Sequence, residues 1–337
     1  MKITIQEVAK KANVSVATVS RVMNGNYPVK TETKEKVMQV INELNYIPNI
    51  QARELTQKKS TAVGVVVPSI NNMFFTELIS SLEKSLKENS LSLILTCSND
   101  DYEEEMNCIN SLIARNVSGI IVASPSSKNI KSGFYKGLAQ KYPIVFINSD
   151  YTDLNISCVS TDESSGAKEA LKYLNENNHK DIIFVRGKDS YSYDLKEKAY
   201  IDFMNEINNF IPDNIINIGN GNNLNTVENT MNIFSEKLKS NHFTAVFACN
   251  DLMAVGVLNA CKKLSIKVPD EISIIGYDNI ALCNFVEPKL TTIDQKISEL
   301  GSNAAELLLE KIKCDNQSSK RIILYNSLIE RETVTKI

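Results

Sequence analysis

The sequence predicts two fold classes in one chain: a small all-α head, followed by an α/β core of two doubly wound parallel-sheet lobes. Helix start and stop signals recur through the first 46 residues. From residue 62, short runs rich in β-branched residues alternate with amphipathic helical patterns, which is typical of parallel sheets covered on both faces. A chain of 337 residues, 43% of them apolar, is long enough to bury two or three such cores.

The head carries the local signals of three short helices. Thr4 and Glu7 have the spacing of a capping box at the start of the first helix. Ser15 can cap a second helix, which Asn24 and Gly25 end. A third helical pattern spans residues 30–45. Three helices around one small core, the first two joined by a tight turn, predict a helix-turn-helix.

The second helix has an unusual exposed side, with hydroxyl and methyl groups where a solvated helix carries lysine and glutamate. The side chains on or near this side are Ser15, Val16, Ala17, Thr18, Ser20 and Arg21. Small side chains suit a helix that enters a DNA major groove about 12 Å wide. Arg21 can donate twice to guanine, and Val16 and Ala17 can contact thymine methyl groups. An ordinary capped helix in a bundle is the alternative, but it does not explain this surface.

The charge distribution agrees with a head that meets a polyanion. Residues 1–60 carry ten basic and five acidic residues, so the head has a net charge of +5 and the remainder −8. A simple charged tail is the alternative explanation.

Several protein classes find no support. The seven cysteines are scattered without a CxxC pair, so we expect reduced packing residues, no metal site and no cofactor. Neither GxGxxG after a strand, nor GxxxxGK[ST], nor a histidine cluster is present, which argues against an enzyme. We interpret the acidic run 100–105 as a solvated helix start. A transported-solute binding protein would need an export signal, whereas the first residues are amphipathic, so we expect a cytoplasmic protein.

The head resembles that of the lactose/galactose repressor family of transcription regulators. The resemblance rests on "ITIQEVAKKANVSVATVSRVMNG", "LNYIPN" and "ARELTQKKS" at the family's spacing. It implies base contacts from Val16, Ala17 and Arg21. The phosphate contacts that it implies are Ser15, Thr18, Ser20, Asn24, Thr33, Tyr46 and Asn49. We also count Thr4 and Ala52 among the DNA contacts.

Residues 47–60 contain a marginal helix of under three turns, too short to be stable alone in water. Such a helix would order only on binding or pairing. The resemblance implies a hinge helix that pairs with its dimer mate in the minor groove, with Leu55 as the apolar wedge that kinks the duplex. A flexible linker is the alternative.

The body divides into two lobes. The expected strands are "AVGVVV", "LSLILTC", "SGIIVAS", "PIVFINS", "DIIFVRG", "TAVFACN" and "ISIIGYD". We expect a helix-turn-helix domain at 1–46, a hinge at 47–60 and an effector-binding and dimerisation core at 61–337. Within the core, the N-lobe is expected at about 61–160 and 290–321, and the C-lobe at about 161–289 and 322–337.

A ligand cleft is expected where the strands of the two lobes end. Through "FFTEL", "CNDLMAVGV", "IIGYDN" and "PKLTTI", the body resembles the periplasmic-binding-protein-like core of the same family. The ligand contacts expected at matching positions are Phe74, Ser124, Asn148, Lys196, Asn250 and Asp278. For each residue singly, a capped turn or a packing role is the alternative. Lys196 replaces an arginine usual in sugar- and purine-binding members, and Gly221 stands about where many carry a stacking aromatic.

The lysine variant is similar to the catabolite control protein branch, which responds to a seryl-phosphorylated phosphocarrier protein as well as to sugar phosphates. In "QKISELGSNAAELL", however, Ser298 and Glu306 hold the positions where that branch would carry tyrosine and arginine. An acidic residue repels a phosphoserine, so this partner is the weaker hypothesis.

These observations predict a homodimeric DNA-binding transcription regulator, a repressor of a pseudo-palindromic operator. Its affinity for DNA would be modulated by a small molecule in the cleft, a sugar or a sugar phosphate, acting as inducer or corepressor. The chain shows no leucine-heptad tail, which favours a dimer over a tetramer. The alternative is a global catabolite control regulator with the phosphocarrier protein as corepressor.

Overall fold

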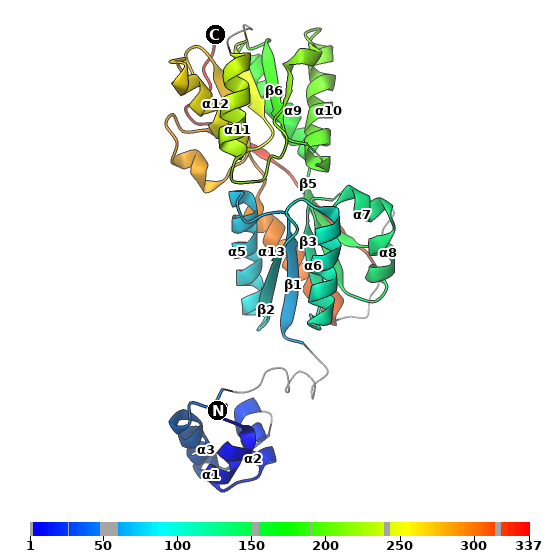
Figure 1. Ribbon diagram of the computed structural model, residues 1–337, viewed down its shortest axis with the longest axis vertical. Helices are drawn as coiled ribbons and strands as arrows, with labels where there is room; N and C mark the ends of the chain where they lie inside the picture. Colours follow the sequence, from blue (N-terminus) through cyan, green and yellow to red (C-terminus); the bar gives the residue numbers. More distant parts are fainter. Residues whose placement is uncertain are drawn as a thin grey trace. The chain divides into compact units, whose positions relative to one another are not determined.

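The computed structural model describes residues 3–25, 27–47, 60–149, 155–188, 190–238, 243–313 and 318–337. Contacts divide the chain into two units, Met1–Ser60 and Thr61–Ile337. The helices of the first unit are α1 (Ile5–Ala12), α2 (Val16–Asn24) and α3 (Thr31–Glu43) (Figure 1).

The ends of these helices follow the predicted local signals. The Thr4 hydroxyl accepts from the Glu7 amide, and the Glu7 carboxylate accepts from the Thr4 amide at 2.7 Å, which confirms the capping box. The Ser15 side chain accepts from the Thr18 amide at the start of α2. Gly25 ends α2 with a φ of +67°, a left-handed conformation that glycine adopts without a steric penalty.

The core of the first unit consists of small apolar side chains from all three helices. Its fully packed members are Val8, Ala9, Ala12, Val19, Val22, Val37 and Val40. Each helix contributes one side to this core and leaves the other side exposed to solvent.

The N-lobe of the second unit is built on a six-stranded sheet in the order β11-β5-β4-β3-β1-β2, all pairs parallel. Its strands are β1 (Ala62–Val67), β2 (Ser92–Cys97), β3 (Ile120–Ala123), β4 (Ile144–Ile147), β5 (Ser157–Thr161) and β11 (Arg321–Leu324). Its helices are α5 (Met73–Glu88), α6 (Tyr102–Ala114), α7 (Ser127–Lys131), α8 (Phe134–Ala139) and α13 (Ile297–Lys313).

Both faces of this sheet are covered. Alternate strand residues such as Val65 pack with Leu82 of α5 and Leu308 of α13. The intervening residues, such as Val66, pack on the other face with Leu112 of α6. Because both faces are buried at the centre of the sheet, β1, β3 and β4 are continuously apolar, as the sequence predicted, whereas the edge strands β2 and β11 are partly exposed.

The C-lobe contains a second six-stranded sheet, in the order β12-β10-β9-β8-β6-β7. Its strands are β6 (Ile182–Arg186), β7 (Ile215–Asn217), β8 (Ala245–Ala248), β9 (Ser273–Asp278), β10 (Thr291–Asp294) and β12 (Ser327–Ile329), the last antiparallel to β10. Its helices are α9 (Glu163–Glu176), α10 (Tyr191–Glu206), α11 (Thr226–Lys237) and α12 (Asp251–Lys263), with 3-10 turns at Pro212–Asn214 and Ala281–Asn284. In Figure 1, α9 and α10 lie on one side of this sheet and α11 and α12 on the other.

The chain passes from one lobe to the other after β5, after β10 and after β11. Two of the expected lobe boundaries are therefore wrong. Residues 291–294 belong to the C-lobe, because β10 completes the hydrogen-bond ladder of β9 before the chain crosses. Residues 321–324 belong to the N-lobe, because β11 pairs with β5 before the chain crosses back. Within the described residues, no helix is both long and apolar enough to span a membrane.

Candidate functional site

The exposed side of α2 carries the residues predicted to contact bases. Val16 is 41% exposed, and Ala17 and Arg21 are also exposed, whereas Val19 on the opposite side is fully buried. The Arg21 guanidinium lies 5.4 Å from the centre of the Tyr27 ring, a cation–π distance. The exposed side of α2 therefore presents two small apolar side chains, Val16 and Ala17, together with the guanidinium donor of Arg21.

Polar side chains flank this surface at both ends of α2. The Ser15 and Thr18 hydroxyl oxygens lie 2.9 Å apart near the helix start. The Asn24 amide donates to the Ser20 hydroxyl at 3.2 Å near its end. Hydroxyls and amides in these places could reach phosphate oxygens on either side of a groove.

The remaining predicted DNA contacts fall in three environments. Thr4 is exposed and caps α1, Thr33 is half-buried in the first turn of α3, and Tyr46 packs partly against the head core. Asn49, Ala52 and Leu55 lie outside the described residues. All of these DNA roles remain predictions.

In the second unit, a cavity of about 290 Å³ lies between the lobes, at the carboxyl ends of the strands of both sheets. The six predicted ligand contacts all line it: Phe74, Ser124 and Asn148 from the N-lobe, and Lys196, Asn250 and Asp278 from the C-lobe. Ser124 follows β3 and Asn148 follows β4, both with a positive φ, so the chain turns sharply at the cavity wall. Asp278 has a φ of +123°, a rare conformation for a residue with a side chain. Ligand binding by these residues remains a prediction.

Lys196 lines the cavity, but it is not a free cation. Its ammonium group lies 2.8 Å from the Glu163 carboxylate, and it donates to the Ser192 hydroxyl at 3.0 Å and the Cys249 carbonyl at 3.1 Å. It also lies 3.7 Å from the centre of the Tyr277 ring. The three N–H bonds of the ammonium group thus have protein acceptors. Burial alone would lower the pKa of Lys196, but the charges of Glu163 and Asp278 outweigh it, so the pKa lies above its ordinary value.

Asp278 and Gln295 connect the base of the cavity to the crossings between the lobes. The Gln295 amide donates to the Asp278 carboxylate, while its oxygen accepts from the Thr161 hydroxyl at 3.0 Å. Asp278 is 4% exposed, and loss of hydration raises its pKa well above the ordinary value, although nearby Lys196 acts in the opposite direction. Gln295 immediately follows β10, so a change at Asp278 reaches a chain segment that joins the lobes.

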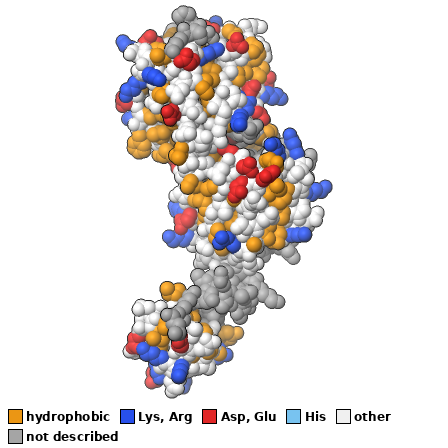
Figure 2. Space-filling model, in the orientation of Figure 1, with side chains coloured by type: hydrophobic (Ala, Val, Ile, Leu, Met, Phe, Trp, Pro, Cys, Tyr) orange, Lys and Arg blue, Asp and Glu red, His pale blue; other side chains and the backbone are white. Residues whose placement is uncertain are grey.

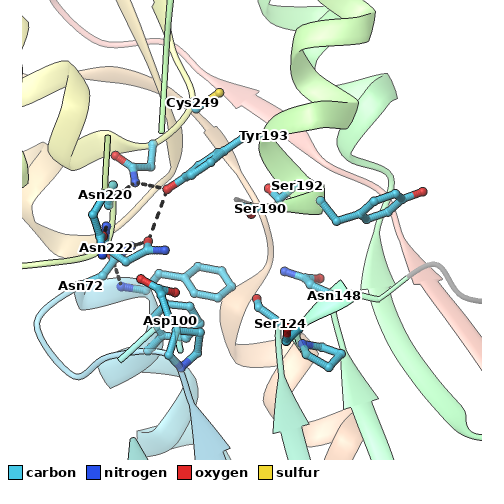
Figure 3. Close-up of a pocket in the computed structure, with 18 of the residues that line it drawn as sticks. Asn72, Asp100, Ser124, Asn148, Ser190, Ser192, Tyr193, Asn220, Asn222 and Cys249 are labelled. Carbon is cyan, nitrogen blue, oxygen red and sulfur yellow. Dashed lines mark hydrogen bonds between the residues drawn. The ribbon is translucent and has the colours of Figure 1, made fainter. Parts of the chain in front are cut away.

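A second polar cluster joins the lobes at the cavity mouth (Figure 3). The Asn72 amide of the N-lobe donates to the Asn222 side chain of the C-lobe at 3.0 Å. Amides of Asn222 and Asn220 also donate to Asp100 of the N-lobe. Part of Asp100 is accessible to water, yet the surrounding protein removes enough hydration to raise the pKa of its carboxyl group, with the amides acting against this effect.

The acidic run 100–105 is only in part a solvated helix start. Asp101 caps α6, and Glu103 and Glu104 are exposed, in agreement with that interpretation. Asp100, however, joins the mouth cluster, and Glu105 is 3% exposed. Glu105 accepts from the Tyr135 hydroxyl at 2.7 Å and from Asn129 at 2.8 Å, so it braces α7 and α8. The sequence of the run does not reveal that Glu105 is buried while Glu103 and Glu104 are exposed. Helical geometry turns Glu105 inward, and residues far away in the sequence supply its hydrogen-bond partners.

The space beside Gly221, about where many family members carry a stacking aromatic, is occupied by side chains from other elements. A side chain at Gly221 would collide with the Tyr193 hydroxyl of α10 and with Met253. Tyr193 also receives a long hydrogen bond from Asn250. An aromatic side chain therefore lines this wall, but it is Tyr193 of α10, which is not among the predicted ligand contacts.

Glu163, Gln295 and the mouth residues Asn72, Asp100, Asn220 and Asn222 are not among the ligand contacts predicted from the sequence. Glu163 and Gln295 each follow the end of a strand, as do the predicted ligand residues Ser124 and Asn148. That position was the available signal, but the sequence does not show which strand ends face each other. Among the described residues, no group of three or more His, Cys, Asp or Glu side chains could hold a metal ion.

A helix-turn-helix with an exposed reading side, in one chain with a two-lobed unit that encloses a cavity, defines a class: ligand-responsive DNA-binding regulators. Comparison with known proteins supports this class. The family model described as "Bacterial regulatory proteins, lacI family" matches residues 4–49, and the "Periplasmic binding protein-like domain" matches residues 171–334.

Similar proteins extend over nearly the whole chain. Catabolite control protein A of Staphylococcus epidermidis is 33% identical over 336 residues, 99% of each chain. The Lac repressor dimer bound to operator and the anti-inducer ONPF is 25% identical with a TM-score of 0.85, covering 99% of this chain and 100% of that one. A LacI family regulator from Enterococcus faecalis V583 with bound ribose is 28% identical with a TM-score of 0.71, covering 82% of this chain and 99% of that one.

This chain belongs to the LacI family of bacterial regulatory proteins. It is a DNA-binding transcription regulator with a periplasmic-binding-protein-like body.

Proposed function

We propose that the protein is a homodimeric repressor whose affinity for a pseudo-palindromic operator depends on a small effector in the cavity between the lobes. One observation carries the proposal: the same chain presents an exposed reading side on α2 and a polar cavity at the strand ends of its second unit. The Lac repressor, similar over 99% of this chain, supports it as a dimer bound to operator. Such a regulator works in the cytoplasm, where the chromosome is.

In this scheme, each head reads one half of the operator. Val16, Ala17 and Arg21 contact bases, while the hydroxyls and amides at both ends of α2 contact phosphates. Ligand in the cavity changes the angle between the lobes, and the change reaches the hinge because only one lobe arrangement favours its pairing. Effector and operator then change each other's affinity by the same factor.

The first test is affinity selection of genomic fragments from the host by the purified full-length protein, followed by sequencing of the bound DNA. We expect enrichment of a pseudo-palindrome beside one transport or catabolic operon. Selection of fragments without any shared motif would contradict sequence-specific binding.

The hinge has its own test, which uses Leu55 as the proposed wedge. Leu55→Ala should weaken binding to the selected operator and leave salt-sensitive, nonspecific DNA binding unchanged, because only the specific complex includes the kinked step. Thr56→Ala, in the same segment, is the matched control. An equal loss of affinity for the operator and for nonspecific DNA would show that Leu55 is not a wedge at a kinked base step.

A second candidate function is global catabolite control with a seryl-phosphorylated phosphocarrier protein as corepressor. The similarity to catabolite control protein A favours it. Helix α13 opposes it, because Ser298, Glu299 and Glu306 are exposed there, and the carboxylates would repel a phosphoserine. Micromolar binding of the phosphorylated carrier in a pull-down, with operators at many carbon-metabolism promoters, would favour this candidate over a local repressor.

We propose regulation without catalysis. Sugar phosphates and nucleotides incubated with the protein should be recovered unchanged, and any turnover that follows the protein through purification would contradict this part of the proposal.

A further inference from the structure

Several strong hydrogen-bond donors of the cavity already serve protein acceptors. Lys196 donates to Glu163, Ser192 and the Cys249 carbonyl. Gln295 donates to Asp278, and Asn250 donates to the Gly221 carbonyl at 3.0 Å. At the mouth, the side-chain amide of Asn72 donates to Asn222, and those of Asn220 and Asn222 donate to Asp100. A ligand that consists mainly of acceptors would have to break these bonds before it could bind.

Acceptors, in contrast, remain for a ligand. The side-chain oxygen of Asn148 is buried and has no hydrogen-bond partner among the described residues (Figure 3 shows its place in the wall). Asp278 lies at the base of the cavity, and Asp100 lies at its mouth. A buried acceptor without a partner costs free energy, so a donor group on the ligand gains by meeting it.

The charged residues that line the cavity also favour a ligand with donor groups. The carboxylates that line the cavity are Asp100, Asp101, Glu105, Glu163 and Asp278, and the lysines are Lys188 and Lys196. The charge of Lys196 is paired with Glu163. Figure 2 shows acidic side chains gathered beside the boundary between the lobes. The lining therefore holds more carboxyl groups than amino groups, which favours a cation and opposes an anion.

Helix N-termini could reverse this preference, because their free amides bind anions. In this chain, side chains occupy those amides at three helices whose caps line the cavity. Asn72 accepts from the Phe74 amide of α5, Asp101 accepts from the first turn of α6, and Asn250 accepts from the Met253 amide of α12. The cap of α6 is itself acidic, so it would repel a phosphate. The N-terminus of α10 also lines the cavity and has no side-chain cap, but the Glu163 carboxylate accepts from the Ser192 hydroxyl in its first turn at 2.9 Å.

We propose that the effector is a small polyol that carries a protonated amine, of the amino-sugar class, and that phosphorylated sugars are excluded from this cavity. The hydroxyl groups donate to Asn148, and the ammonium group meets Asp100. This inference rests on the proposed function, since it names the ligand of the same cavity. Of the two effector classes expected from the sequence, a sugar and a sugar phosphate, it selects the sugar.

The test is calorimetric titration of the full-length protein with three matched sets at slightly acidic pH, where the amine is protonated. The sets are glucosamine, galactosamine and mannosamine, their parent hexoses, and the corresponding hexose 6-phosphates. We expect one amino sugar to bind about tenfold tighter than its parent hexose, as a charge-assisted bond replaces a neutral one, and no heat from the phosphates.

Two variants locate the preference. Asp100→Asn should reduce the advantage of the amino sugar over the parent hexose, because it removes a carboxylate from the cavity lining. Glu103→Gln removes the same charge from the exposed start of α6, outside the cavity lining, and should leave the advantage unchanged.

Three outcomes would overturn the inference: tightest binding by a 6-phosphate, equal binding of the amino sugar and its parent, or binding by none of the nine sugars. Each of them leaves operator selection by the same preparation as a separate result. Failure of operator selection, in contrast, would overturn the proposed function, whatever the sugars do.

Discussion

The two units of the chain stabilise themselves in different ways. The first unit has an apolar core of small side chains, and its polar groups form short-range bonds at helix ends, such as those of Ser15 and Thr4. The second unit buries Lys196, Glu163 and Asp278 between its lobes. Local caps can be replaced at small cost, whereas buried charges depend on each other. The difference indicates that the second unit, more than the first, responds to pH and ligand.

The largest expected effect is in the second unit. Lys196→Met leaves the Glu163 carboxylate buried without its partner, so the free energy of unfolding should fall by about 3–5 kcal/mol. Urea unfolding of the full-length protein measures it. The double variant with Glu163→Gln should recover much of the loss, because both charges are then absent.

Lys198→Met is the matched control, because Lys198 is exposed on the same helix. It should change stability little. A Lys196→Met protein as stable as the control would show that the ion pair does not stabilise the lobes.

The next effect concerns recognition by the first unit. Arg21→Ala should weaken binding to the selected operator by about 1–3 kcal/mol and relax the preference at one base pair, because a bidentate contact to guanine is lost. Binding to a set of operators, each with one substituted base pair, measures both. Arg115→Ala removes the same charge from the exposed end of α6 and should have neither effect. Uniform weakening on every DNA would instead make Arg21 a phosphate contact.

A smaller effect tests how far the first unit depends on its local caps. Ser15→Ala removes the acceptor of the Thr18 amide, which should destabilise the head by about 1 kcal/mol. Hydrogen exchange of the DNA-free full-length protein should then be about fivefold faster in the protected amides of 4–44, with the second unit unchanged. Unchanged exchange in the head would mean that core packing alone holds α2.

The smallest effect is the pH dependence contributed by His179. Burial lowers its pKa, although a hydrogen bond to the Thr335 carbonyl at 2.8 Å acts against this. A histidine kept neutral by folding contributes stability above its unfolded pKa of about 6.5, and this contribution is lost as the pH falls through the folded pKa. Thermal unfolding at about pH 7.5 and about pH 5.5 should show a smaller loss for His179→Gln than for the unchanged protein. An equal loss would assign the pH dependence to other groups.

The described part of the first unit, its three-helix head, could be predicted almost entirely because its signals are local. The capping box of Thr4 and Glu7, the cap at Ser15 and the left-handed Gly25 each involve residues within a few positions. The same holds for strands such as β1, β3 and β8, which follow from apolar runs, whereas β5, β7, β10, β11 and β12 are not among the runs expected from the sequence. Strand pairing is different, since β10 and β11 were placed in the wrong lobes. Their sequences read as strands in either sheet, and only hydrogen bonds to β9 and β5 decide between them.

The sequence by itself determined the fold class, the helix-turn-helix with its exposed reading side, and the family, because caps, periodicity and motif spacing are properties of neighbouring residues. It also identified six residues of the cavity wall. Only the tertiary structure decided what the polar residues around the cavity are free to do: Lys196 has no N–H left for a ligand, and Asp100 and Glu105, expected in a solvated helix start, accept hydrogen bonds from distant parts of the chain. Hydrogen-bond partners and hydration depend on residues far away in the chain, and the fold alone brings them together.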